Sequence, residues 1–183
     1  MIYVWSAILL YLGAASEVVL GTTGLPTPFA PLVAFYIFVI YGWRRTIAIA
    51  LPAVLVADVY FARPGLPTVA MLPLIAYISW LWRTHGDSTH RLSLALPGMT
   101  IAVLGGIAPG LSAMALQAHP VGAIITSFAV ILPACAVVGA VALPVGAWVF
   151  DFIADRAGLT RIADIKPPRK RPNARKSRRQ YQG

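Results

Sequence analysis

Charge is scarce in this chain. Only 11% of its 183 residues are Asp, Glu, Lys or Arg, whereas an ordinary soluble domain has about 25%. The stretch from Leu92 to Phe150 contains none of these four residue types. The six acidic residues lie scattered along the chain, so they supply neither the acidic metal cluster nor the paired base that a lipid-modifying enzyme needs. We therefore expect no enzyme, no metal site and no cofactor.

Cysteine is also nearly absent, and histidine is rare. Cys135 is the single cysteine, which excludes an intramolecular disulfide and leaves a thiolate metal site without a second sulfur ligand. We interpret it as a small apolar residue. His85, Asp87 and His90 gather in one polar stretch, but their spacing fits no strong metal-binding template. A solvated loop is the expectation there.

Apolar residues dominate instead. They make up 58% of the chain, and the mean hydropathy is +0.75. A membrane span needs roughly 20 predominantly apolar residues, and only helices or closed barrels satisfy their backbone polar groups inside lipid. A barrel would show alternating apolar and polar residues, and this sequence does not. The composition therefore predicts an all-α, polytopic integral membrane protein.

Six apolar runs predict a bundle of six transmembrane helices. The expected spans are 2–20, 25–43, 46–61, 67–82, 92–116 and 121–150. They form one membrane domain over residues 1–156, in which the last stretch, from Asp151 to Arg156, is expected at the surface. Residues 157–183 form a basic tail that we expect to be disordered.

The distribution of positive charge predicts the orientation. Of the 15 Lys and Arg residues, 14 fall in the turn around Arg44 and Arg45, in the loop between the fourth and fifth spans, or after the last span. The opposite side holds only Arg63. Because cytoplasmic sides carry the positive excess, both termini are expected in the cytoplasm.

Two carboxylates lie inside predicted spans, at similar depths. Asp58 follows Arg45 by 13 residues, which at 1.5 Å per residue is ~20 Å from the inner surface. Glu17 follows Ile2 by 15 residues. Charges within spans are rare and usually face the bundle interior, and Tyr3, Ser6, Gly13 and Glu17 share one stripe of the first helix that is expected to face protein.

Two interpretations of these polar residues are open. In the first, Glu17, Asp58 and Arg63 form an ion or proton site, or a polar contact with a partner helix. In the second, Asp58 and Arg63 form a structural pair near the outer interface, and Glu17 is exposed at the end of its helix. Arg63 is the only cation expected on that side in either case.

The tail holds a dense basic cluster. Its members are Lys166, Arg169, Lys170, Arg171, Arg175, Lys176, Arg178 and Arg179. Basic clusters that follow a cytoplasmic helix end bind anionic lipid at about 1 kcal/mol per residue near the surface. We expect the tail to bind anionic lipid or to fix the topology, with a protein partner as the alternative. No nucleic acid is expected, because the chain has no folded module to read it.

The stretch 35–77 resembles the MreD family, the small rod shape-determining membrane proteins of bacteria. The resemblance covers about a quarter of the chain closely. It rests on four motifs in order: Tyr41-Gly42-Trp43-Arg44-Arg45, Val56-Ala57-Asp58, Pro64-Gly65 and Leu74-Ile75-Ala76-Tyr77. The chain length, the six expected spans and a last helix running through Pro144 to Arg156 are similar too.

The resemblance implies a non-catalytic scaffold subunit of the cell-wall elongation complex, in the bacterial inner membrane. Such proteins are similar in fold to the substrate-binding (S) subunits of energy-coupling-factor transporters. The implied partners are an MreC-like single-span protein and, through it, MreB and the complex of RodA with its penicillin-binding protein. Our hypothesis is that a groove between helices binds the partner's transmembrane helix, with Glu17, Asp58 and Arg63 at the outer contact.

An alternative is an S-type subunit that binds a small, vitamin-like molecule from outside. It would use the outer carboxylates and the loop from Gly21 to Pro31. With so little material outside the predicted spans, either function would depend on helix faces, short loops and the tail.

Overall fold

Every element of the described chain is helical. The computed structural model describes residues 2–21, 28–63, 65–86, 91–115 and 121–165. Within these ranges lie six α-helices and two short 3₁₀ turns: α1 (Ile2–Gly21), α2 (Phe29–Tyr41), α3 (Trp43–Tyr60), α4 (Pro67–His85), η1 (Arg91–Leu94), α5 (Ala95–Ala115), α6 (Val121–Arg156) and η2 (Ile162–Asp164). The predicted all-α class is confirmed, and each predicted span corresponds to one α-helix.

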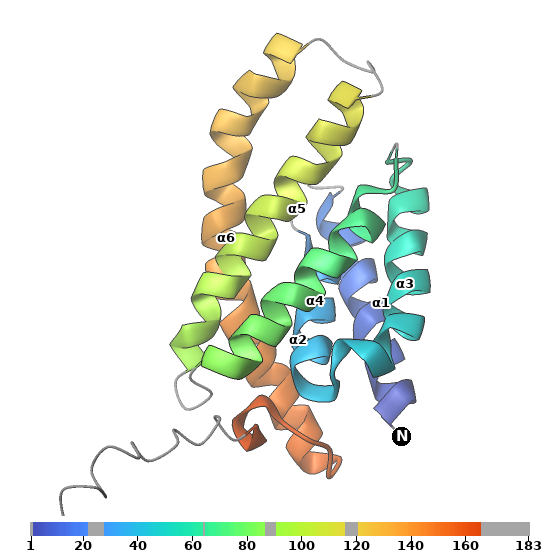
Figure 1. Cartoon of the computed structure of the whole chain (residues 1–183), viewed down its shortest axis with the longest axis vertical. Helices are drawn as coiled ribbons and strands as arrows, with labels where there is room; N and C mark the ends of the chain where they lie inside the picture. The colour runs from blue at the N-terminus through green and yellow to red at the C-terminus, as the bar shows by residue number, and fades with distance from the viewer. Residues whose placement is uncertain (1, 22–27, 64, 87–90, 116–120, 166–183) are drawn as a thin grey trace, which may run out of the picture.

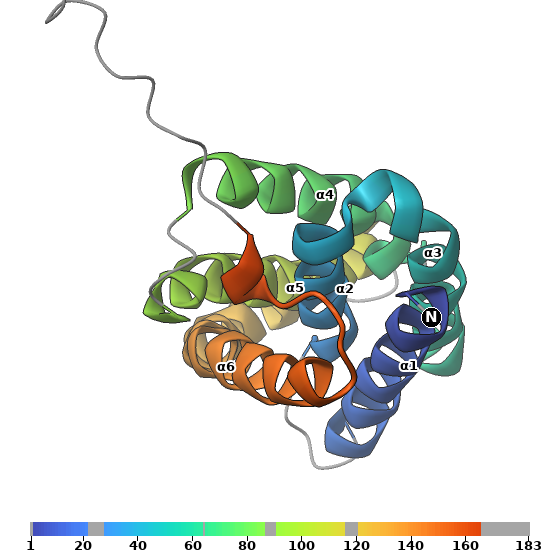
Figure 2. The same ribbon diagram turned by 90° about the horizontal axis from the view of Figure 1, so that it is seen from below.

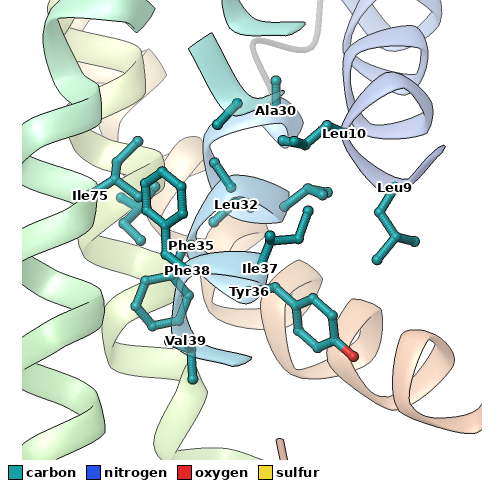
Figure 3. Packing of buried hydrophobic residues seen from close by; sticks show 14 of the residues in the cluster. Leu9, Leu10, Ala30, Leu32, Phe35, Tyr36, Ile37, Phe38, Val39 and Ile75 are labelled. Atoms are coloured by element: carbon teal, nitrogen blue, oxygen red, sulfur yellow. The ribbon is translucent and has the colours of Figure 1, made fainter. Parts of the chain in front are cut away.

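Helix α2 is the centre of the bundle. It contacts all five other α-helices, and Figure 2 shows it surrounded by them. All of its residues from Ala30 to Ile40 are buried. A helix that is apolar on every side is stable only when it is buried on every side. Figure 3 shows side chains such as Phe35 and Ile37 leaving α2 in different directions to meet different neighbours.

Successive helices run in opposite directions. Helix α1 begins and α6 ends at the same end of the bundle, the lower end in Figure 1. The α2–α3 turn lies at this end as well, and the α3–α4 loop lies at the other. We call the first of these the terminal end and the second the far end.

Among the described residues, three helices are long and apolar enough to cross a membrane, at Tyr3–Leu20, Leu92–Ser112 and Phe128–Arg156. Helix α2 is apolar but has only 13 residues. At 1.5 Å per residue it is ~20 Å long, against a hydrocarbon core of about 30 Å. The chain therefore has the character of a helical membrane protein, with a short central helix.

The second and third helices are joined more tightly than the sequence suggests. The span predicted at 25–43 begins at Phe29 and ends at Tyr41, and Gly42 alone separates it from α3. Gly42 has φ +82°, a left-handed conformation that glycine adopts without steric cost. Arg44 and Arg45, predicted in a turn between spans, therefore belong to the first turn of α3.

Residues just after the last helix also differ from the prediction. Helix α6 continues to Arg156. Within the stretch predicted at the surface, Asp155 and Arg156 are exposed, but Asp151 is only 5% exposed. The following η2 turn packs on α2 and α6, with Ile162 only 3% exposed. The first part of the predicted tail, up to Ile165, is therefore folded, because the apolar side chain of Ile162 packs into the core.

The predicted buried stripe of α1 is mostly correct. Three of its four members are buried: Ser6, Gly13 and Glu17. Tyr3, however, is 59% exposed, whereas Leu9 and Leu10 are fully buried. Helix α1 packs against both α2 and α3, so its buried face is wider than one polar stripe.

Candidate functional site

The three predicted polar residues meet at the far end of the bundle. An Arg63 guanidinium nitrogen lies 2.7 Å from a Glu17 carboxylate oxygen, and the other lies 3.6 Å from Asp58. The two carboxylates are 2% and 0% exposed, and the Arg63 side chain is 21% exposed. The prediction that Glu17 is exposed at its helix end is therefore wrong. We call these three residues, with Thr68, the far-end network.

Asp58 caps the start of helix α4. Its Oδ2 accepts the backbone N–H groups of Thr68 at 2.9 Å and Val69 at 3.1 Å, and its Oδ1 accepts the Thr68 hydroxyl. The first N–H groups of a helix have no partner within the helix, and negative charge is favourable there. The N-cap position itself, Leu66, provides no side-chain hydrogen bond, so a carboxylate from α3 takes over the capping.

Glu17 performs the same role at the start of helix α2. Its Oε2 accepts the backbone N–H of Ala30 at 3.1 Å. Pro28, at the N-cap position of α2, makes no side-chain cap bond. The carboxylates of α1 and α3 therefore hold the first turns of α2 and α4, and Arg63 joins the two caps.

The loop that carries Arg63 is conformationally strained. Ala62 and Leu66 have φ values of 48° and 50°, in the left-handed region that non-glycine residues rarely adopt. The Arg63 N–H donates to the Asp58 backbone carbonyl at 2.9 Å, and its guanidinium lies 4.6 Å from the centre of the Phe61 ring. Such strain persists only where surrounding contacts hold it, and here it returns Arg63 to the buried carboxylates.

The geometry gives this network a structural role. Its carboxylates are occupied by Arg63, Thr68 and the two helix starts. Nowhere in the described ranges do three or more His, Cys, Asp or Glu side chains gather as metal ligands would. Contact between this network and a partner, or with a small molecule, stays a prediction.

An apolar groove lies beside the network. Helices α1 and α6 both pack on α2, but no Cα of α1 lies within 8 Å of a Cα of α6 in the described structure, and between the two helices lies a groove of about 300 Å³. Its floor is formed by residues of α2 and its walls by residues of α1 and α6. The wall residues include several small ones: Gly13, Ser16, Ala142, Gly146 and Ala147. We call this the α1–α6 groove.

The sequence reasoning missed a further buried carboxylate. Asp151 accepts the Tyr36 hydroxyl at 2.9 Å and the backbone N–H of Ile162 at 3.1 Å. It thereby fastens η2 and the end of α6 to the central helix. The available signal was Tyr36 in the middle of the apolar α2, since a buried tyrosine hydroxyl usually finds a partner.

Other predicted site residues lie outside the described residues. They are the eight basic residues of the tail, from Lys166 to Arg179, together with Asp87, His90 and most of the loop between Gly21 and Pro31. The described part of that loop differs from the prediction, since Phe29 to Pro31 belong to α2.

No family model, curated protein or solved structure matches this chain. The resemblance to the MreD family therefore stays a prediction from the sequence. The features that bear on function are the α1–α6 groove and the network beside it.

Proposed function

We propose that this chain is a non-catalytic membrane scaffold that binds the transmembrane helix of a partner in its α1–α6 groove. In this proposal all six helices lie in a bacterial inner membrane, with both termini in the cytoplasm. The observation that carries the proposal is the groove itself, in which two helices flank a third without meeting.

The lining of the groove suits another helix. Helix association in membranes depends on close packing, and its interfaces are enriched in small residues that let backbones approach. On the α6 wall, a Cβ added to Gly146 would have only the Phe150 ring nearby, at 3.7 Å. That position is open, whereas Gly13 on the α1 wall is already packed, since a Cβ there would lie 2.8 Å from Val33.

The far-end network supports this function by fixing a wall of the groove. Glu17 ties α1 to the first turn of α2, and the adjacent Ser16 lines the groove. The network thus holds α1 at its distance from α6. In the sequence-based hypothesis these charged residues touch the partner themselves. Burial of Glu17 and Asp58 favours positioning instead, which leaves only the partly exposed Arg63 for a direct contact.

The resemblance to the MreD family supplies the identity of the partner. We propose an MreC-like single-span protein, and through it MreB and the RodA-type wall-synthesis complex. Loss of its function would then appear as loss of rod shape.

Filling the groove tests the proposal. The Gly146→Leu variant places a side chain in open space and improves helix propensity by about 1 kcal/mol, so the fold should be retained. We expect it to lose co-purification with the MreC-like protein of the same bacterium. Gly122→Leu is the matched control, because it lies on the same helix with nothing within 4 Å of its Cβ position and outside the groove.

The two variants separate the outcomes. Equal recovery of the partner with Gly146→Leu and Gly122→Leu would show that the partner does not bind in the groove. No recovery with the unaltered chain would show that the MreC-like protein is not its partner. Asp58→Ala tests the far-end network separately. We expect this variant to bind the MreC-like protein more weakly, because the helices that the network holds would be displaced. Loss of rod shape with association intact would count against the network as part of the partner site.

The alternative of a transporter S subunit gains no specific support. The carboxylates it would use are bonded to Arg63 and to helix starts. A thermal-shift screen of the purified chain against vitamins and metal ions discriminates between the two functions. A ligand that sharply raises the unfolding temperature would favour the transporter subunit.

A further inference from the structure

Three arginines surround a pocket at the terminal end of the bundle. The pocket has a volume of about 490 Å³ and lies where the α2–α3 turn meets the end of α4. Arg44 and Arg45 come from the first turn of α3, and Arg83 comes from the last turn of α4. All three side chains are exposed, and no carboxylate of the described chain lines the pocket. We call it the arginine pocket.

The positive charge in this pocket has no counter-ion within the described chain. No ion pair among the described residues includes Arg44, Arg45 or Arg83. The nearby Asp155 and Asp164 are both engaged by Arg161. Positive charge in the first turn of a helix is also unfavourable, because the helix dipole is positive there. An anion bound in the pocket would offset this unfavourable charge at the start of α3.

Tyr41 also lines the arginine pocket. Its hydroxyl is buried, so the exposed arginines are the groups that a ligand can reach there. Arginine guanidinium groups form paired hydrogen bonds with the oxygens of a phosphate group.

An apolar groove adjoins the arginine pocket. The groove has a volume of about 560 Å³ and runs between α3 and α4, lined by Ile47 and Leu51 on one side and by residues from Val69 to Trp80 on the other. Trp43 and Trp80 line both spaces, so the two lie side by side. Both rings are about half exposed, at 41% and 52%. Tryptophan at such a boundary is typical of the membrane interface.

The length of this groove corresponds to one leaflet. Eleven residues separate Val69 from Trp80, which at 1.5 Å per residue is ~16 Å. Half of the bilayer's hydrocarbon core is about 15 Å. An acyl chain lying in the groove would therefore extend from the arginine pocket along α4 toward Val69, whose N–H bonds to Asp58 of the far-end network.

We infer that these two adjoining spaces together bind one anionic phospholipid. The arginine pocket binds the phosphate headgroup, the two tryptophans flank the interface, and an acyl chain lies between α3 and α4. Charge complementarity selects this occupant, because a partner helix would leave the three arginines without an anion. Basic pockets at the cytoplasmic ends of membrane helices are known sites for anionic headgroups. The site lies on α3 and α4, away from the α1–α6 groove, so it rests on the proposed membrane orientation but not on partner binding in that groove.

The test is lipid binding to the full chain in an uncharged detergent. Native mass spectrometry counts bound phosphatidylglycerol and compares it with phosphatidylcholine, and we expect the anionic lipid to bind at least about tenfold more tightly. At about 1 kcal/mol per basic residue, each of Arg44→Gln, Arg45→Gln and Arg83→Gln should weaken binding about fivefold. The triple variant should weaken it about a hundredfold.

The matched control removes the same charge elsewhere. Arg175, Arg178 and Arg179, changed together to Gln, should leave the tightest phosphatidylglycerol site within about twofold. The opposite pattern, with lipid lost in the tail variant and retained in the pocket variant, would overturn the site. Folding of each variant is checked by its unfolding temperature in phosphatidylcholine micelles, and the single Arg83→Gln variant serves if the triple variant unfolds.

Two further measurements distinguish the source of the phosphate. Phosphatidylglycerol with brominated acyl chains should quench tryptophan fluorescence, and Trp43→Phe or Trp80→Phe should reduce that quenching. Inorganic phosphate at a hundredfold excess should not displace the lipid. Displacement by phosphate alone, or lipid binding without quenching, would reject the acyl-chain groove.

Discussion

The two ends of the bundle use arginine in opposite ways. At the far end, Arg63 lies against Glu17 and Asp58, both almost fully buried. At the terminal end, Arg44, Arg45 and Arg83 surround a pocket that no described carboxylate lines. Within the described chain, the far end is neutralised and the terminal end is not.

The difference follows from burial. A charge removed from water must be paired and hydrogen-bonded, because its desolvation costs several kcal/mol. Glu17 and Asp58 therefore need Arg63, Thr68 and the helix starts. The exposed arginines at the other end keep their hydration and need no partner to fold, so they are available to an external anion. A charged side chain that the fold itself neutralises has partners within the protein, whereas one that is available to a ligand does not.

Removal of Arg63 should have the largest effect. Arg63→Met leaves two buried carboxylates without their cation, and the unfolding free energy should fall by about 3 kcal/mol. Thermal unfolding in detergent measures the loss. Arg44→Met is the control, and as an exposed residue it should change stability by no more than about 0.5 kcal/mol. Equal losses in both variants would remove the distinction between the two ends.

The hydroxyl of Thr68 should contribute less. It donates to Asp58 and accepts a bond from Arg63 at 3.1 Å, so Thr68→Val should cost about 1–2 kcal/mol. Thr84→Val on the same helix is the isosteric control, because its hydroxyl donates to backbone carbonyls of its own helix, those of Trp80 and Leu81. A neutral Thr68→Val would show that the far-end network is held by charge alone.

Salt should affect the two ends differently. Raising the ionic strength from 0.1 M to 1 M shortens the Debye length from about 10 Å to about 3 Å. Phosphatidylglycerol binding to the arginine pocket should weaken several-fold, because its charges face water. The stability loss of Arg63→Met should stay within about 0.5 kcal/mol, because buried pairs are screened little. A salt-independent lipid affinity would argue against the exposed arginines as the binding groups.

The smallest effect is expected from pH, at the η2 turn. Hydrogen bonds from Arg161 hold the pKa of Asp164 below its usual value, which is about 3.9. The native state therefore favours the charged carboxylate. Its stabilising contribution is present above the unfolded pKa and is lost as the pH falls through the lower folded pKa.

Amide hydrogen exchange checks this prediction. The Ile165 N–H bonds to the Ile162 carbonyl at 3.0 Å, and its protection should fall below about pH 4. Asp164→Asn should show that lower protection at all pH values. The same pH dependence in this variant would assign the titration to another group.

The depth of the buried carboxylates in the bundle could be predicted from the sequence, but their hydrogen-bond partners could not. Counting residues placed Glu17 and Asp58 at one level with Arg63 nearby, and the structure brings all three together. The count could not reveal that Glu17 caps α2 and Asp58 caps α4, because those contacts join residues 13 and 10 positions apart through the packing of different helices. Asp151 was misplaced at the surface for the same reason, since its partner Tyr36 lies 115 residues away.

The sequence by itself determined the helical class and the six helices, because apolar composition and chain length act locally and need no knowledge of neighbours. Tertiary structure alone decided which helix became the centre, which charges were neutralised and which grooves stayed open. Those outcomes depend on helix faces meeting in three dimensions. An arginine in the sequence looks the same whether a carboxylate from another helix reaches it, as at Arg63, or none in the described chain does, as at Arg83.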